Sequence, residues 1–331
     1  MCSRTMWSVA GQPVLIGRNM DWTAEQRNKL HVMPRGIEMN GMVPENPLKW
    51  TSKYGSITVS TYDCCTLDGM NEAGLGVSAL YLAEATYGER DPSIPGLCSS
   101  VHVQYYLDNF VTVAEAVAAS KSFQVQPMLM VHQGYEAKSP LHVTVADKSG
   151  DSAIFEIFDG EVSIHHGKDV TVATNSPPYE EQLKYLKQFK GLGGDKPLPG
   201  SFEANDRFVR GAYYLTQLPN PPKSYQSAVA GILSVMRSQA TPLGANDPVR
   251  PNVAATIYQS VADLTNLRYY HNVTDMPNVV WIDLKNQNLE EGTPIKTFDL
   301  YEDREAAGEV SGKFHPSPPI AWQMAGTKIP M

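Results

Sequence analysis

The chain has 331 residues, of which 42% are apolar and 19% are charged, and its formal net charge at pH 7 is −8. These proportions are typical of a soluble globular protein, and the negative charge argues against binding to nucleic acid or to an anionic membrane. No apolar run approaches the ~18 residues that a membrane helix needs, so neither nucleic acid nor membrane is expected as a partner.

The first elements of the chain predict a β-hairpin. Residues 4–9 and 13–18 alternate between the two sides of a strand, and a turn at Gly11 separates them. Because this turn is short, the second strand must lie beside the first. Arg18 and Asp21 are therefore expected to return to the start of the chain.

A second group of strands follows a loop region rich in proline and asparagine. Residues 56–62 alternate well enough for a strand, and residues 68–70 and 75–82 flank a turn that predicts a second hairpin. A short strand is also expected near residues 30–33. The helical period then appears between residues 95 and 126, where Thr112 and Glu115 fit a capping box at the start of the second of two helices.

Further strands and helices alternate in blocks along the rest of the chain. An antiparallel meander that ends at Asn175 is expected from the strands 142–146, 153–158, 161–165 and 170–174. Three helices are expected at 179–189, from Asn205 or Asp206 to Leu218, and at 225–238. The last strands are expected at 256–262, 267–271 and 279–284, and the proline-rich residues 290–331 are expected to wrap the surface in an extended form.

This order of elements predicts an α+β fold. Antiparallel hairpins and segregated helix pairs are accommodated most economically by two sheets packed face to face between helical layers, a four-layer αββα sandwich. No internal repeat or linker divides the chain, so residues 1–331 are interpreted as a single domain.

Cys2 is the first candidate for chemistry. Methionine before a small residue is readily removed, which would leave Cys2 with both a thiol and a free α-amine. An α-amine has an ordinary pKa of about 7.7–8.0, so it can accept a proton from the thiol near neutral pH. Arg18 would favour the thiolate, and Asp21 would orient the amine. On their own, Arg18 and Asp21 are equally compatible with a surface ion pair.

Cysteine and histidine spacing argues against other chemistries. The remaining cysteines, Cys64, Cys65 and Cys98, are too few and too irregular for a disulfide framework, and no CxxC, zinc spacing or HExxH occurs. No metal and no cofactor is therefore expected. No motif supports a redox function for the adjacent Cys64 and Cys65.

Four blocks of sequence carry a resemblance to a known family. In order, they are the near-terminal cysteine with GRNMDW, then DGMNEAGLGVSALYL, VATNSPPYEEQL and NDRFVR, and they span residues 2 to about 210. Together they resemble the choloylglycine hydrolase and penicillin V acylase family of N-terminal-nucleophile hydrolases, which cleave linear amides. The segment TIYQSVADLTNLRYYHNVTDMPNVVWIDL is similar to the family's C-terminal strands. The resemblance also implies the αββα sandwich.

The resemblance implies a role for each matching residue. Cys2 matches the nucleophile, Arg18 the arginine beside the thiol, and Asp21 the aspartate that holds the α-amine. Asn175 matches the asparagine whose amide donates to the oxyanion, and Arg207 matches the second active-site arginine. From the local sequence alone, Asn175 fits a turn equally well, and Arg207 fits a solvated helix position.

Tyr81 and its neighbours are the expected substrate-binding residues. Bile salt hydrolases have an asparagine in the segment aligned with Tyr81, whereas penicillin V acylases resemble this chain in having tyrosine. A backbone N–H near Tyr81 or Leu82 is expected to be the other oxyanion donor. Trp22 and Tyr87 are candidates for an aromatic wall that receives the acyl group, although core packing explains both equally well.

The predicted function is hydrolysis of a small-molecule acyl amide, most similar to that of penicillin V acylases. Activity on N-acyl homoserine lactones is implied by the Gram-negative branch of the family, to which the short stretch between Asn175 and Arg207 points. The alternatives are a bile salt hydrolase and, in another class, a non-catalytic ligand-binding protein on the same fold.

Assembly and compartment are also expectations from the resemblance. A homotetramer or homodimer is expected, although the short stretch before Arg207 leaves the tetramer contacts in doubt. No signal-peptide pattern opens the chain. A periplasmic location after removal of a leader is favoured, with the cytoplasm as the alternative.

Overall fold

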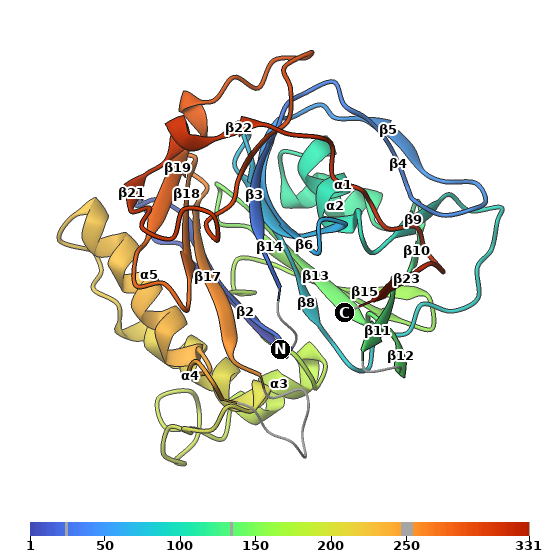
Figure 1. Cartoon of the computed structure of the whole chain (residues 1–331). Helices are drawn as coiled ribbons and strands as arrows, with labels where there is room; N and C mark the ends of the chain where they lie inside the picture. Colours follow the sequence, from blue (N-terminus) through green and yellow to red (C-terminus); the bar gives the residue numbers. More distant parts are fainter. Residues whose placement is uncertain (24–25, 133–134, 246–253, 331) are drawn as a thin grey trace.

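Two large β-sheets face each other in the computed structural model, which describes residues 1–23, 26–132, 135–245 and 254–330 (Figure 1). The described strands of the first sheet, in spatial order, are β16 (Val172–Ala173), β1 (Cys2–Trp7), β2 (Leu15–Asp21), β17 (Thr256–Asp263), β18 (Arg268–Val273), β19 (Val280–Asp283) and β21 (Gly308–Glu309). Those of the second are β15 (Glu161–His166), β14 (Ser152–Phe158), β13 (Leu141–Asp147), β8 (Leu75–Tyr81), β7 (Cys65–Asn71), β6 (Ser56–Thr61), β3 (Lys29–Met33), β20 (Lys296–Phe298) and β22 (His315–Pro316).

Helices cover the outer face of each sheet. α4 (Ala204–Gln217) and α5 (Tyr225–Gln239) pack on the first sheet, whereas α1 (His102–Asn109) and α2 (Val113–Ala119) pack on the second, on the opposite side of Figure 1. α3 (Tyr179–Leu186) packs against α4. The layers therefore run helix, sheet, sheet, helix, and the predicted αββα sandwich is confirmed. Within the described residues, no helix is both long and apolar enough to cross a bilayer.

The first sheet buries side chains on both of its faces. Alternate residues of a strand point to opposite sides, so Met6 and Ile16 enter the core between the sheets, while Trp7 and Leu15 pack beneath α5. Gly17 of β2 lies directly under this helix. A Cβ built at Gly17 would come within 2.4 Å of the side chain of Met236, so glycine permits the close approach of α5.

The N-terminal hairpin and the capping box are confirmed. β1 and β2 pair in the register Cys2↔Met20 and Arg4↔Arg18. Thr112 caps α2 by accepting from the Glu115 backbone, and the Glu115 carboxylate accepts from the Thr112 backbone at 3.0 Å. The predicted start of the helix at Asn205 or Asp206 is wrong, because α4 begins after Glu203 and neither residue is its N-cap.

One predicted strand belongs to the other sheet. Residues 170–174 were expected to end the meander of β13, β14 and β15, but β16 instead pairs with β1, with Ala173 opposite Arg4. The sequence pattern does not reveal this, because an alternating strand fits either edge equally well. β1 has a free edge that needs hydrogen-bond partners, and β16 supplies them. The crossing delivers Asn175 to the first sheet.

Residues 290–331 do not only cover the surface. They supply β20 and β22 to the second sheet and β21 to the first, and Phe298, Leu300 and Val310 are buried. Shorter strands that were not predicted also occur. These are β4 (Glu38–Asn40), β5 (Lys49–Thr51), β9 (Gly96–Cys98), β10 (Gln124–Gln126), β11 (Leu129–His132), β12 (Tyr135–Lys138) and β23 (Lys328–Pro330). At three or four residues, they are too short for alternation to indicate a strand.

We expect Thr112→Ala to lower the free energy of unfolding by about 1 kcal/mol, because it leaves the amide of Glu115 without its acceptor at the start of α2. Thermal unfolding followed by circular dichroism measures the change. Thr216→Ala is the matched control, because Thr216 is exposed inside α4 and bonds only within its own helix. Equal stability of the two variants would contradict the role of the cap.

Candidate active site

Cys2, the first residue of β1, lines a pocket of about 680 Å³ that opens between the two sheets. Aromatic walls come from Trp22, Tyr62 and Tyr81, and the other apolar lining comes from Met20, Leu67, Ala79, Met128, Pro140 and Leu141. None of the described residues in this lining is charged. The pocket therefore places a thiol at the wall of a mainly apolar chamber.

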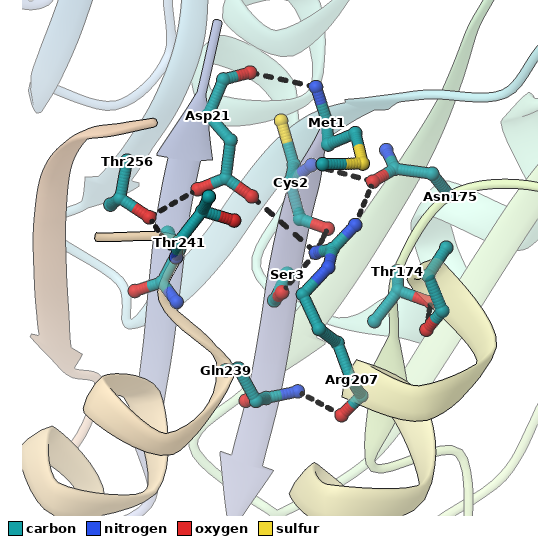
Figure 2. A network of polar contacts seen from close by, with 12 residues as sticks. Met1, Cys2, Ser3, Asp21, Thr174, Asn175, Arg207, Gln239, Thr241 and Thr256 are labelled. Carbon is teal, nitrogen blue, oxygen red and sulfur yellow. Dashed lines mark hydrogen bonds and ion pairs between the residues drawn. The ribbon is translucent and has the colours of Figure 1, made fainter. Parts of the chain in front are cut away.

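Met1 extends the first strand and lies over the site. Its ammonium group donates to the Asp21 carbonyl at 2.7 Å, and the Asp21 amide donates to the Met1 carbonyl at 2.9 Å. The backbone N–H of Cys2 donates to Oδ1 of Asn175 at 2.7 Å (Figure 2). Burial lowers the pKa of the Met1 α-amine. An amine in this environment gives up its proton more readily than one in water.

Arg18 lies beside the thiol on the neighbouring strand. Its Nη2 is 3.9 Å from Sγ of Cys2 and donates to the Ala79 carbonyl at 2.8 Å, and its Nη1 donates to the hydroxyl of Tyr258. Burial would lower the pKa of Arg18, but Tyr258, Cys2 and Asp68 outweigh burial and raise it. The guanidinium therefore stays charged and favours the thiolate form of Cys2.

Asp21 lies at the end of β2 with a buried carboxylate. Oδ1 accepts from the Thr256 hydroxyl at 2.6 Å, and Oδ2 is 3.5 Å from Nη1 of Arg207. Among the described residues, Oδ2 has no hydrogen-bond partner. A buried acceptor without a donor is costly, so this oxygen is suited to an ammonium group delivered next to it.

Arg207 of α4 ties the separate parts of the site together. Its Nη1 donates to the Cys2 carbonyl and to the Ser3 hydroxyl, both at 2.6 Å, and its Nη2 donates to Oδ1 of Asn175 at 2.7 Å (Figure 2). The side chain is fully buried. A planar guanidinium with five donors holds these groups in one fixed arrangement.

The edge of β8 is open where it meets the nucleophile. β8 pairs with β13 along its whole length, but with β7 only as far as Ser78. Beyond that point the Ala79 carbonyl accepts from Arg18 at 2.8 Å, and the Tyr81 carbonyl accepts from Nδ2 of Asn175 at 2.6 Å. The side chains of Arg18 and Asn175 thus supply hydrogen bonds to the part of β8 that β7 leaves unpaired.

The direction of the backbone N–H groups along β8 decides whether Tyr81 or Leu82 can donate to the site. The N–H of Leu82 donates to the Pro140 carbonyl at 3.0 Å, so it points toward β13 and away from the site. Within a strand, the N–H and C=O of one residue point to the same side. The N–H of Tyr81 therefore points toward Asn175, as its carbonyl does. Asn175 has two amide N–H groups, and the bond to Tyr81 uses one of them.

The structure brings six predicted residues together and leaves two outside the pocket. The residues that converge at the site are Cys2, Arg18, Asp21, Tyr81, Asn175 and Arg207, and Trp22 lines the pocket with its Nε1 donating to the Tyr62 hydroxyl at 3.1 Å. Leu82 and Tyr87 are not part of the pocket lining, so their expected substrate contacts stay a prediction. The Tyr87 hydroxyl instead donates to the Ser139 carbonyl and accepts from the Leu141 amide, each at 2.9 Å. Tyr87 thus supports two residues of the wall.

Several residues of the site escaped sequence analysis. Tyr258 and Thr256 lie on a predicted strand, but only the pairing of β17 with β2 brings them to Arg18 and Asp21. Tyr62 adopts a left-handed backbone with φ of 53°, which turns its ring into the pocket. Nothing in the sequence distinguishes it from an ordinary turn residue. Among the described residues, no cluster of three histidine, cysteine or acidic side chains could hold a metal.

Comparison with known proteins places this site in a family. A model described as linear amide C–N hydrolases, choloylglycine hydrolase family, matches residues 2–299. Penicillin V acylase from Pectobacterium atrosepticum is 36% identical over 331 aligned positions, which cover 92% of this chain and 87% of that protein. The structure of penicillin V acylase from Agrobacterium tumefaciens has a TM-score of 0.88 at 36% identity and covers 97% of this chain and 99% of that one.

Bile salt hydrolases are more distant relatives. The bile salt hydrolase/transferase of Clostridium perfringens is 25% identical over 312 positions, which cover 86% of this chain and 92% of that protein. A variant of conjugated bile acid hydrolase from the same organism has a TM-score of 0.75 at 23% identity, a likeness of fold alone. With a cysteine at the start of β1 and the family model matched from that residue onward, the chain belongs to the choloylglycine hydrolase family and is a linear amide C–N hydrolase.

Proposed function

We propose that the protein is a penicillin V acylase-type hydrolase in which Cys2 is the nucleophile after Met1 has been removed. The observation that carries this proposal is the convergence of Arg18, Arg207 and Asn175 on Cys2 at the wall of an apolar pocket. Among the described residues, the pocket lining carries no charged side chain and the two arginines lie beside Cys2, so the pocket can receive an uncharged acyl group.

Removal of Met1 converts the backbone amide of Cys2 into a free α-amine. That nitrogen already faces Oδ1 of Asn175, and Oδ2 of Asp21, which lies 3.5 Å from Arg207 but accepts no hydrogen bond among the described residues, is a further acceptor at the site. The same burial that lowers the pKa of the Met1 amine would act on the amine of Cys2. A partly deprotonated amine next to the thiol is suited to serve as a general base.

The proposed reaction proceeds through a thioester. The sulfur of Cys2 attacks the amide carbonyl carbon, and its proton passes to the α-amine. The spare N–H of Asn175 and the backbone N–H of Tyr81 donate to the oxyanion. The α-ammonium then gives its proton to the leaving nitrogen as the C–N bond breaks. Water attacks the thioester, the α-amine takes one water proton, and the acid and the free thiol are released.

We expect Cys2→Ala to abolish hydrolysis of penicillin V, because no other group can form the thioester. Release of the amine product measures activity, and intact-mass spectrometry shows whether active preparations lack Met1. Cys98→Ala is the control, since Cys98 is buried outside the pocket lining. Activity in Cys2→Ala, or in a chain that keeps Met1, would contradict the mechanism. A chain that keeps Met1 and hydrolyses no amide would favour the ligand-binding role.

We expect Asn175→Ala to lower kcat roughly 100- to 1000-fold, because it removes one donor to the oxyanion. Steady-state hydrolysis of penicillin V measures this loss, and alkylation of Cys2 by iodoacetamide verifies that the nucleophile remains accessible. Asn109→Ala, on the outer helix α1, is the matched control. A kcat within about threefold of the unmodified enzyme would exclude the oxyanion role of Asn175.

The pocket favours acyl groups without hydroxyls. Four of its polar side chains are hydrogen-bonded in pairs, because Thr61 donates to Gln26 at 2.6 Å and Trp22 donates to Tyr62 at 3.1 Å. A buried hydroxyl that finds no partner costs about 1–3 kcal/mol. Aryl and fatty acyl groups avoid this cost, so N-acyl homoserine lactones are the second candidate substrates. The hydroxylated sterol of a bile salt does not avoid it.

We expect kcat/KM for penicillin V and for a long-chain N-acyl homoserine lactone to exceed that for glycocholate by at least about tenfold, the factor that corresponds to one unpaired buried hydroxyl. Parallel assays of product release at matched substrate concentrations measure the ratio. Faster hydrolysis of glycocholate would instead favour the bile salt hydrolase alternative.

We also propose that the chain forms a homodimer or homotetramer. In support, several large apolar side chains are exposed among the described residues and could be covered by another copy. They are Ile94, Phe202, Leu243 and Met324. Analytical ultracentrifugation of the mature protein tests the proposal.

A further inference from the structure

The backbone around Asn175 is held by buried side chains that the mechanism above does not use. Nε2 of His142 donates to the carbonyl of Thr174 at 2.9 Å, and Oε1 of Glu156 accepts from the backbone N–H of Tyr179 at 2.9 Å. These two hydrogen bonds hold the backbone on either side of Asn175. His142 lies on β13 and Glu156 on β14, so both contacts come from the second sheet.

Glu156 is the centre of this arrangement. Its Oε2 contacts Nε2 of His165 at 3.1 Å, and its Oε1 lies 3.7 Å from Nδ1 of His142. Burial would raise the pKa of Glu156, but the contacts with His142 and His165 lower it to about 2. The carboxylate is therefore ionised at every pH at which the enzyme would operate. Its two oxygens face donors on three different elements.

The protonation of His142 follows from its partner. A carbonyl oxygen can only accept a hydrogen bond, so Nε2 of His142 must carry a proton to bond to Thr174. Nδ1 then faces the Glu156 carboxylate at 3.7 Å, too far for a hydrogen bond. His142 bonds to Thr174 before Asn175 and Glu156 bonds to Tyr179 after it, so the two side chains hold the intervening segment from both ends.

We propose that the buried pair of His142 and Glu156 positions Asn175 for oxyanion stabilisation, and so sets the rate of the chemical step without touching the substrate. The inference rests on the proposed role of Asn175. Asn175 follows β16 of the first sheet, whereas the Tyr81 donor belongs to β8 of the second. The two donors must be held relative to each other, and the pair makes this connection across the sandwich.

Glu156→Gln is the first test. Glutamine carries no charge and has one acceptor oxygen, so it can keep the bond from Tyr179 only by turning an amide N–H toward His165 where Glu156 presents a carboxylate oxygen. We expect kcat for penicillin V to fall at least tenfold, with KM within about twofold and the rate of Cys2 alkylation by iodoacetamide unchanged. Glu161→Gln, an exposed position on the adjacent strand β15, is the control and should retain wild-type rates.

A pair of substitutions at His142 separates positioning from general support. His142→Gln keeps an N–H that can reach the Thr174 carbonyl, whereas His142→Leu removes the donor. We expect most of the kcat lost in His142→Leu to return in His142→Gln. If both variants have the same kcat, or if kcat falls only together with Cys2 alkylation and thermal stability, the positioning role is overturned. These variants keep the test valid should Glu156→Gln fail to fold.

A double-mutant cycle identifies the route of the effect. If Glu156 acts through Asn175, Glu156→Gln should lower kcat no further when Asn175 is already alanine. If the double variant instead loses kcat by the product of the two single-variant losses, the inference is overturned. A normal kcat in Asn175→Ala alone would instead overturn the oxyanion role on which the inference rests, so the two failures can be told apart.

Discussion

A single buried guanidinium holds the site together. Arg207 reaches from α4 to the first sheet and bonds at once to the backbone of Cys2, to the hydroxyl of Ser3 and to Asn175, and it lies 3.5 Å from Asp21. A fully buried charge must be paired and hydrogen-bonded to be tolerated. The cost of leaving Arg207 unsatisfied therefore ties three distant segments of the chain to one geometry.

The two sheets contribute different parts to the same reaction. The first supplies the thiol and its basic neighbours, and the second supplies the pocket wall and the open edge of β8. This edge ends its pairing with β7 at Ser78, and the carbonyls of Ala79 and Tyr81 then bond to Arg18 and Asn175. Unpaired backbone groups at a sheet edge usually favour pairing with another chain. Here they accept hydrogen bonds from side chains of the proposed active site.

In the proposed mechanism, the chemistry of the site depends on the removal of Met1. Met1 has a defined position, because its ammonium group and its carbonyl both form hydrogen bonds with the backbone of Asp21. Its removal exchanges an amide for an amine without moving Cys2, because Cys2 is anchored by Arg207 and Asn175. The fold can therefore be complete before the nucleophile becomes active.

The sequence by itself determined the order of the elements and the first hairpin, because these depend on alternation and turn chemistry over short distances. It indicated the residues at the site only through the resemblance of its motif blocks to a known family. It could not assign β16 to the first sheet or place Tyr258 beside Arg18, since strand pairing is a long-range choice that neighbouring residues do not encode. Only the tertiary structure decided that Tyr81 rather than Leu82 turns its N–H toward Asn175. The reason is the register of β8 against β13, because the N–H of Leu82 already donates to the carbonyl of Pro140.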